Sequence, residues 1–236
     1  MRDGRDNHLI FMERNYPKRI EPNKCTVFFD FDNTVVTRDV FDDLVLRFSR
    51  NNRWRDLEEK WKRGEIGSKE CLSGQLKGVN ITRQALNKYL SSINLDPCFK
   101  KLVKLLKRKK IKTVILSDNF DYLLQRILKE NRIKNLKVLA NKLQLSHNRL
   151  IPRFPFEDGS CRLCAHCKTK NLLANARRNS IIIYIGDGRS DICPAQYSDI
   201  VFAKEALLDY YRKKKLTCFA YQGLEDVYNF LRRRLR

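Results

Sequence analysis

The feature that most constrains the fold is a set of three short apolar segments, each of which runs into polar residues. Residues 25–31 are almost entirely aromatic or β-branched, and residues 112–116 and 181–185 have the same character. Runs this short and this uniformly apolar are typical of strands that are buried on both faces of a parallel sheet. The three segments therefore predict the centre of an α/β protein.

Helical patterns alternate with these strands, near residues 99–106, 120–128, 168–177 and 224–231. Residues 137–156 indicate short strands with a turn at His147 and Asn148, and Ile200–Phe202 and Thr217–Phe219 are predicted as edge strands. Strands that alternate with helices predict a three-layer, Rossmann-like core around a parallel sheet.

A helical insertion interrupts the core after the first strand. Val40, Phe41 and Leu44 begin an apolar stripe at helical spacing, and glycines mark later breaks in the region. The predicted division is a polar leader at 1–22, a core at 23–37 and 97–236, and a small helical cap at 38–96.

Polar residues gather where the predicted central strands end. They are Asp30, Asp32 and Thr34, then Ser117, then Asp187 and Asp191. Carboxyl ends of parallel strands meet at one edge of a sheet, where an open α/β sheet binds its ligand. Four carboxylates in one crevice repel one another, so we expect a divalent cation with oxygen ligands, namely Mg²⁺.

Asp30 and Asp32 are two residues apart on an extended segment, so their side chains start on the same face. With a cation present, one carboxylate can attack as a nucleophile while the second acts as general acid and then as base. This division of labour is what transfer of a phosphoryl group through an aspartyl-phosphate requires.

The order of these motifs resembles a known signature. Asp30-Phe-Asp32-Asn-Thr34, Ser117, Lys168 and Gly186-Asp-Gly-Arg-Ser-Asp191 are similar to the four motifs of the haloacid dehalogenase (HAD) superfamily of phosphatases, from about Cys25 to the end. The resemblance implies that Asp30 is the nucleophile and a metal ligand. Asp32 would be the acid/base and would offer its backbone carbonyl to magnesium. Ser117 and Lys168 would hold the phosphoryl oxygens, and Asp187 and Asp191 would complete the metal site.

The insertion after the first motif resembles the helical cap of the phosphoserine-phosphatase-like branch, which closes over the substrate and sets specificity. Asp39 matches the position of an acidic residue that faces the substrate amine in phosphoserine phosphatases. Asp118 and Asn119 depart from the Ser-Gly-Gly-Phe pattern of those enzymes; they either bind near the phosphate and orient the substrate or make a turn.

Two further segments resemble narrower groups. Cys161-x-x-Cys164-x-x-Cys167-Lys168 looks like the 2-hydroxy-3-keto-5-methylthiopentenyl-1-phosphate phosphatases, and the segment from Gly186 to Pro194 is similar to phosphoethanolamine/phosphocholine phosphatases. The cysteines also have an alternative as zinc ligands, with His166 or Cys193 as the fourth, but a closed zinc site normally uses two pairs. Reduced, partly buried thiols are the simpler expectation.

The chain of 236 residues carries 49 Lys+Arg against 27 Asp+Glu, a formal net charge of +22. This charge is compatible with a nucleic-acid partner, yet no nucleic-acid-binding motif accompanies the basic runs, which favours a solvated lysine-rich surface. No apolar run approaches the roughly 20 residues that span a bilayer, and the first residues are charged, so we expect a cytoplasmic protein without a membrane partner. The pattern does not define the oligomeric state.

The function predicted from the sequence is hydrolysis of a small phosphorylated metabolite by a magnesium-dependent phosphomonoesterase that forms an aspartyl-phosphate. Two alternatives stay open. A phosphatase could use the same chemistry on nucleic-acid ends, or an inactive HAD-fold protein could serve only for binding; the intact Asp30, Asp32, Lys168 and Asp187 oppose the second.

Overall fold

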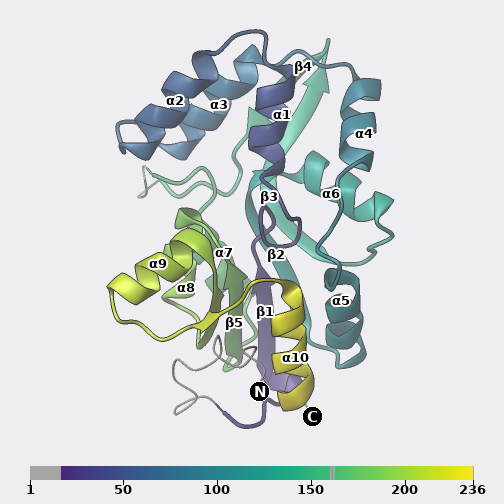
Figure 1. The fold of residues 1–236 in the computed structure, drawn as a ribbon, viewed down its shortest axis with the longest axis vertical. Coiled ribbons are helices and arrows are strands. Elements are labelled where there is room, and N and C mark those ends of the chain that lie inside the picture. Colours follow the sequence, from purple (N-terminus) through teal and green to yellow (C-terminus); the bar gives the residue numbers. More distant parts are fainter. Residues whose placement is uncertain (1–16, 160, 162, 236) are drawn as a thin grey trace, which may run out of the picture.

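The computed structural model describes residues 17–159, 161 and 163–235, and its centre is a seven-stranded sheet in the order β4-β3-β2-β1-β5-β6-β7 (Figure 1). β1 lies in the middle, with parallel partners β2 and β5 on its two sides. β4 pairs antiparallel with β3, whereas the other pairings are parallel. The strands are β1 (Cys25–Phe29), β2 (Lys112–Phe120), β3 (Lys137–Ser146), β4 (Arg149–Arg153), β5 (Ile181–Gly186), β6 (Ile200–Ala203) and β7 (Phe219–Ala220).

Helices cover both faces of this sheet because successive strand side chains point to opposite sides. Phe29 belongs to a large apolar core with α5, α6 and α10, while Phe28 belongs to a second core with α7, α8 and α9. The predicted three-layer α/β core is therefore confirmed. The core helices are α5 (Phe99–Arg108), α6 (Asp121–Glu130), α7 (Lys168–Asn175), α8 (Ile192–Ala195), α9 (Glu205–Lys213) and α10 (Leu224–Arg234).

Four helices lie between β1 and α5, at the top of Figure 1, and we call this part the helical insertion. They are α1 (Val40–Phe48), α2 (Arg53–Lys62), α3 (Ser68–Gly78) and α4 (Arg83–Ser91). The apolar stripe of α1 is buried, and Tyr89 of α4 donates a hydrogen bond to the Val40 carbonyl at 3.0 Å. The β3–β4 hairpin extends from the core to this part, where the Ile81 N–H donates to the Asn148 carbonyl at 2.9 Å.

Two local expectations need correction. Ile200–Phe202 is not at an edge, because the two-residue strand β7 pairs beyond β6, and a strand that short leaves little pattern in a sequence. β2 is longer than the strand predicted at 112–116: it continues past Ser117 to Phe120, and α6 begins at Asp121.

The expected polar leader at 1–22 falls mostly on residues 1–16, which lie outside the described residues. Within the described part, Ile20 is buried, and its N–H donates to the Arg234 carbonyl at the end of α10. This contact ties residue 20 to the core.

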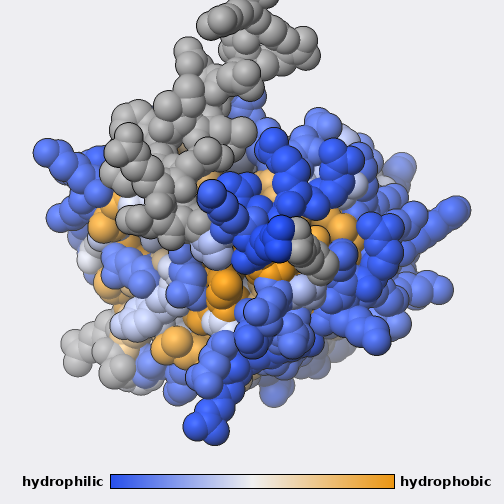
Figure 2. Space-filling view, turned by 90° about the horizontal axis from the view of Figure 1, so that it is seen from below, coloured by the Kyte–Doolittle hydropathy of each residue, from blue (hydrophilic) through white to orange (hydrophobic). Residues whose placement is uncertain are grey.

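Seen from below Figure 1, from the side where α10 ends, the surface is mainly hydrophilic, with smaller apolar areas between the polar side chains (Figure 2). In the part of the chain that the structure describes, no helix has the length and apolar character needed to cross a membrane.

Candidate active site

The site forms where β1, β2 and β5 end side by side. β1 is followed at once by Asp30 and Asp32, and β5 is followed by Asp187. The Asp30 N–H donates to the Ile185 carbonyl at 2.9 Å, so the chain after β1 stays attached to β5. The parallel pairing in the middle of the sheet thus brings two motifs that are about 150 residues apart in sequence to one place.

Lys168, the first residue of α7, lies buried between two carboxylates. Its Nζ is 2.6 Å from Asp30 Oδ1 and 2.7 Å from Asp191 Oδ1, and it also donates to Ser190 Oγ at 2.9 Å. Burial alone would lower the pKa of Lys168, but Asp191 and Asp30 raise it well above its usual value. The ammonium form is therefore maintained next to Asp30.

Asp191 uses both carboxylate oxygens within the protein. Oδ1 accepts from Tyr184 at 2.6 Å as well as from Lys168, and Oδ2 accepts from the backbone N–H groups of Asp187 and Gly188, each at 3.0 Å. Its side chain is fully buried. With four donors already bound, Asp191 is better suited to orient Lys168 and the loop after β5 than to coordinate a cation directly.

Three carboxylates nevertheless form a cluster that is suited to a metal. Asp30, Asp187 and Asp191 are buried, and one oxygen of each lies within 4.8 Å of the others. Burial is the main cause that raises the pKa of Asp30 well above its usual value, and the negative charge of Asp191 is the second. The same two causes raise the pKa of Asp187 to about 7. A hard divalent cation such as Mg²⁺ prefers these oxygen donors and would relieve their repulsion.

Asp32 is held apart from this cluster. Its Oδ1 accepts from the Val40 N–H at 2.8 Å, and the Asn119 amide donates to both carboxylate oxygens, at 3.2 and 3.0 Å. Burial is the main cause that raises the pKa of Asp32 well above its usual range, and the negative charge of Asp39 is the second. A carboxyl group with a raised pKa holds its proton more firmly than an ordinary carboxyl group, which is the property that a general acid needs.

The remaining predicted residues have different surroundings. Ser117 is fully buried, and its Oγ accepts from the Asn119 N–H at 3.1 Å. The Asn119 amide is bonded to Asp32, which makes Asn119 a positioning group for that carboxyl. Asp118 and Asp39 line the cavity beside the site, and Asp39 also caps α1 by accepting from the Asp42 N–H.

A cavity of about 230 Å³ lies between the strand ends and the helical insertion. Its insertion wall contains side chains that the sequence analysis did not single out: Asp42, Glu58, Trp61 and Gln75. Gln75 donates to Glu58 at 3.2 Å, and Trp61 donates to Ser68 at 2.9 Å. No signal in the sequence identifies them, because polar residues on an amphipathic helix look alike whether they face a cavity or water.

The family model described as "Putative Phosphatase" matches residues 25–214. The chain belongs to this family. Among its sequence relatives, Pdp3-interacting factor 1 of Schizosaccharomyces pombe is 24% identical, over 88% of this chain and 94% of that protein. The 2-hydroxy-3-keto-5-methylthiopentenyl-1-phosphate phosphatase of Brevibacillus brevis is 23% identical, over 88% of this chain and 95% of that protein.

Among solved structures, a phospho-aspartyl intermediate analogue of phosphoserine phosphatase superposes with a TM-score of 0.68. It is 16% identical and the match covers 91% of this chain and 99% of that one. This phosphatase is thus a HAD-type enzyme of the phosphoserine-phosphatase-like branch, as the motifs predicted.

The approach of Gly186 to Asp191 generates a prediction. A Cβ at position 186 would lie 2.5 Å from Asp191 Oδ2, so Gly186→Ala must displace the carboxylate that holds Lys168. We expect a loss of about 1–3 kcal/mol in the free energy of unfolding, measured by urea denaturation, together with a loss of phosphatase activity. Gly159→Ala, where a Cβ meets nothing within 4 Å, is the control. Equal stability of the two variants would contradict the role of this contact.

The raised carboxyl pKa values generate a second prediction. Asp187 and Asp39 have a pKa of about 7 in the folded protein against 3.8 ordinarily, so the folded state binds more protons than the unfolded state between these values. Their contribution to stability therefore falls as pH rises from about 4 to 7.

Because Mg²⁺ must displace protons from these carboxyl groups at pH 5.5 but not at pH 8, added Mg²⁺ should raise the melting temperature of the protein more at pH 8. Equal shifts at both pH values, measured against EDTA by differential scanning fluorimetry, would contradict the metal assignment.

Proposed function

We propose that this protein is a magnesium-dependent phosphomonoesterase that forms a phospho-enzyme on Asp30 and acts on a small phosphorylated metabolite. The observation that carries the proposal is the buried contact of Lys168 with Asp30, beside Asp187 and at the edge of the cavity. Two similar proteins, the 2-hydroxy-3-keto-5-methylthiopentenyl-1-phosphate phosphatase of Brevibacillus brevis and phosphoserine phosphatase, are named for small phosphorylated substrates, which supports a substrate of this size.

In the proposed first step, a carboxylate oxygen of Asp30 attacks phosphorus and the bond from phosphorus to the ester oxygen breaks. Lys168 holds Oδ1 of Asp30 and offers its remaining charge to the phosphoryl oxygens. Neutral Asp32 donates its proton to the departing oxygen. The Asn119 amide and the Val40 N–H then stabilise the carboxylate of Asp32 that remains.

In the second step, ionised Asp32 accepts a proton from water as that water attacks the phosphorus of aspartyl-phosphate. Phosphate and free Asp30 result, and Asp32 is again protonated. The same residue thus serves as acid and then as base, and its hydrogen bonds hold it in the lining of the cavity, to which Asp30 also belongs.

Asp30 and Asp187 are the side chains that we assign to the magnesium site, together with the backbone carbonyl of Asp32. When bound, Mg²⁺ supplies positive charge that screens the phosphoryl oxygens and the carboxylate cluster. Asp191, a predicted ligand, has its oxygens occupied and instead positions Lys168 and the loop after β5. Ser117 is proposed to hold a phosphoryl oxygen, although in this structure its hydroxyl accepts from Asn119.

We assign the helical insertion as a cap whose inner wall selects the substrate. That wall is acidic, because Asp39, Asp42 and Glu58 all line the cavity. Burial, followed by the negative charge of Glu58, raises the pKa of Asp42 to about 6. Trp61 contributes an aromatic face. Acidic groups beside an aromatic ring favour a cation, so we propose that the leaving group carries a positive charge, as a phosphorylated amino alcohol does.

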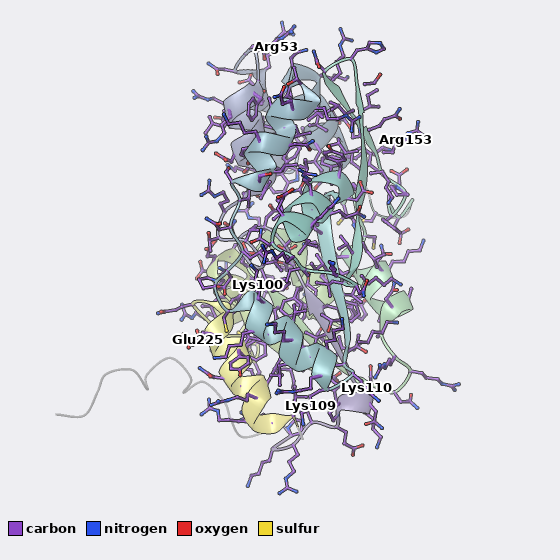
Figure 3. The ribbon with its side chains drawn as sticks, turned by 90° about the vertical axis from the view of Figure 1, so that its right-hand side faces the viewer. Arg53, Lys100, Lys109, Lys110, Arg153 and Glu225 are labelled. Carbon is purple, nitrogen blue, oxygen red and sulfur yellow. The ribbon has the colours of Figure 1, made fainter. Side chains whose placement is uncertain are left out.

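The same wall disfavours a nucleic-acid end, the alternative substrate, because a polyanion would be repelled by it. Among the described residues that line the cavity, Arg189 is basic, against seven residues with carboxyl groups, so the basic side chains are not gathered there. Arg53 lies at the end formed by the insertion, whereas Lys109 and Lys110 lie near the opposite end of the molecule (Figure 3). Such a distribution attracts phosphorylated compounds in general over long range, but it does not form a continuous basic surface along which a nucleic acid could bind.

Removal of the two catalytic carboxyls should have different signatures. Asp30→Asn should abolish hydrolysis of every phosphate ester, because an amide cannot form the phospho-enzyme. Asp32→Asn should lower kcat by about 10²–10⁴-fold for an alkyl phosphate, but by less for p-nitrophenyl phosphate, whose leaving group needs no proton. Steady-state kinetics with Mg²⁺ measure both effects, and Asp209→Asn, on the exposed side of α9, is the control. Equal losses on both substrates would contradict the acid role of Asp32.

The acidic wall predicts substrate discrimination. Glu58→Gln should raise KM for phosphocholine about tenfold, which corresponds to an attraction of about 1.4 kcal/mol, and leave KM for the uncharged leaving group of glycerol phosphate nearly unchanged. Glu59→Gln, an exposed neighbour outside the cavity lining, is the matched control. If Glu58→Gln affected both substrates equally, or if DNA with a terminal phosphate proved the better substrate, the proposed cation site would be wrong.

A further inference from the structure

Asp187, which is assigned to the magnesium site, is held by a side chain that the proposed mechanism does not use. Thr34, in the turn after β1, donates its hydroxyl proton to Asp187 Oδ1 at 2.9 Å. Thr34 and Asp187 are both buried, with exposed fractions of 2% and 6%. This bond fixes the rotation of the carboxylate and thereby the direction in which its second oxygen points.

Thr34 is in turn contacted by Tyr221, the residue directly after the short strand β7. Tyr221 Oη lies 3.2 Å from Thr34 Oγ1 and 3.4 Å from the carbonyl oxygen of Gly186, the residue before Asp187. Tyr221 is buried, and its N–H donates to the Ala203 carbonyl at the end of β6 at 3.2 Å. The pairing of β7 with β6 thus brings a tyrosine hydroxyl to the ends of β1 and β5.

The direction of these hydrogen bonds follows from the protons that are available. A carboxylate that binds a cation is deprotonated and can only accept. Thr34 has one hydroxyl proton, which is used on Asp187. The hydroxyl of Tyr221 is therefore the donor toward Thr34. Two successive hydrogen bonds start at Tyr221 and end on the carboxylate of Asp187.

We propose that Tyr221 is a positioning residue for the magnesium site and acts through Thr34 on Asp187. This inference rests on the metal site of the proposed function. Neither Tyr221 nor Thr34 is among the described residues that line the cavity, so the role does not involve contact with the substrate. Loss of a hydrogen-bond partner of a metal ligand typically weakens metal binding about 10–100-fold.

The ring of Tyr221 also takes part in packing, so the hydroxyl has to be tested alone. Lys204 Nζ lies 5.4 Å from the centroid of this ring, a cation–π contact that Tyr221→Phe retains. Tyr228 in α10 provides a matched control, because it is also buried and Lys101 Nζ lies 4.3 Å from its ring centroid. Tyr228→Phe removes a hydroxyl that is not part of the site.

The first measurement is metal binding by the substrate-free protein, which requires no turnover. The probe is Mn²⁺, which shares the preference of Mg²⁺ for oxygen ligands, and free Mn²⁺ is followed by electron paramagnetic resonance. We expect Tyr221→Phe to raise the Kd for Mn²⁺ about tenfold and Tyr228→Phe to leave it unchanged. In kinetics, the Mg²⁺ concentration for half-maximal activity should rise by a similar factor, while kcat at saturating Mg²⁺ stays within about twofold of wild type.

A cycle of single and double variants tests whether Tyr221 acts through Thr34 rather than on the fold in general. Thr34→Ser keeps the hydroxyl and should retain Mn²⁺ affinity, whereas Thr34→Val removes it and should lose at least as much affinity as Tyr221→Phe. Adding Tyr221→Phe to Thr34→Val should then cause no further loss. Losses that multiply independently would overturn the proposal. If Tyr221→Phe does not fold, equal Mn²⁺ affinity of Thr34→Ser and Thr34→Val would overturn it.

The outcomes for wild-type protein separate this inference from the proposed function. If wild-type protein binds Mn²⁺ and Tyr221→Phe binds it equally well, the positioning role is wrong and the metal site stands. Wild-type protein that binds no Mn²⁺ would overturn the metal site and this inference together. Wild-type protein that binds Mn²⁺ but hydrolyses no phosphate ester would contradict the proposed function, and the comparison of Kd values would still decide the role of Tyr221.

Discussion

The buried contact of Lys168 with Asp30 and Asp191 is the interaction on which the rest of the site depends. Moving one ammonium and two carboxylates out of water is costly, and the cost is offset only if the geometry is close and the remaining polar atoms are bonded. Tyr184, Ser190 and two backbone N–H groups meet that second condition. The ends of β1 and β5 and the start of α7 must therefore keep a fixed arrangement, which also fixes the positions of the proposed catalytic groups.

The local charge of the site opposes the net charge of the chain. A protein with a formal charge of +22 nevertheless has an acidic cavity, in which Asp39, Asp42 and Glu58 extend the carboxylates of the strand ends. The net charge and the local charge act over different distances. The positive field of the whole protein attracts phosphorylated compounds from afar, whereas the acidic wall acts only on the part of the substrate that it contacts. Net charge alone would have favoured a polymer, whereas the cavity lining supports the proposal of a small zwitterionic ligand.

The core was predictable because β1 and β5 are apolar on both faces and their polar ends follow without a break. The grouping of Lys168 with Asp30 was predictable only through the resemblance, since Lys170 in the same basic stretch offers an identical side chain. The acidic wall was not predictable. Glu58 faces the cavity and Glu59 faces solvent, and only the packing of α2 on α3 distinguishes two adjacent glutamates. Asn119 likewise acquires its partner Asp32 only when β1 and β2 pair.

The β3–β4 hairpin adds a constraint on how substrate reaches the cavity. Besides its two chain connections to the core, the helical insertion is held at the hairpin tip through the Ile81 N–H and the Asn148 carbonyl. His147 and Asn148 occupy the left-handed region of a tight turn, which keeps that tip short and stiff. A hinge motion that opened the insertion away from Asp30 would have to break this hydrogen bond or carry the hairpin along. Movement of the insertion away from Asp30 and movement of the hairpin tip are thereby coupled.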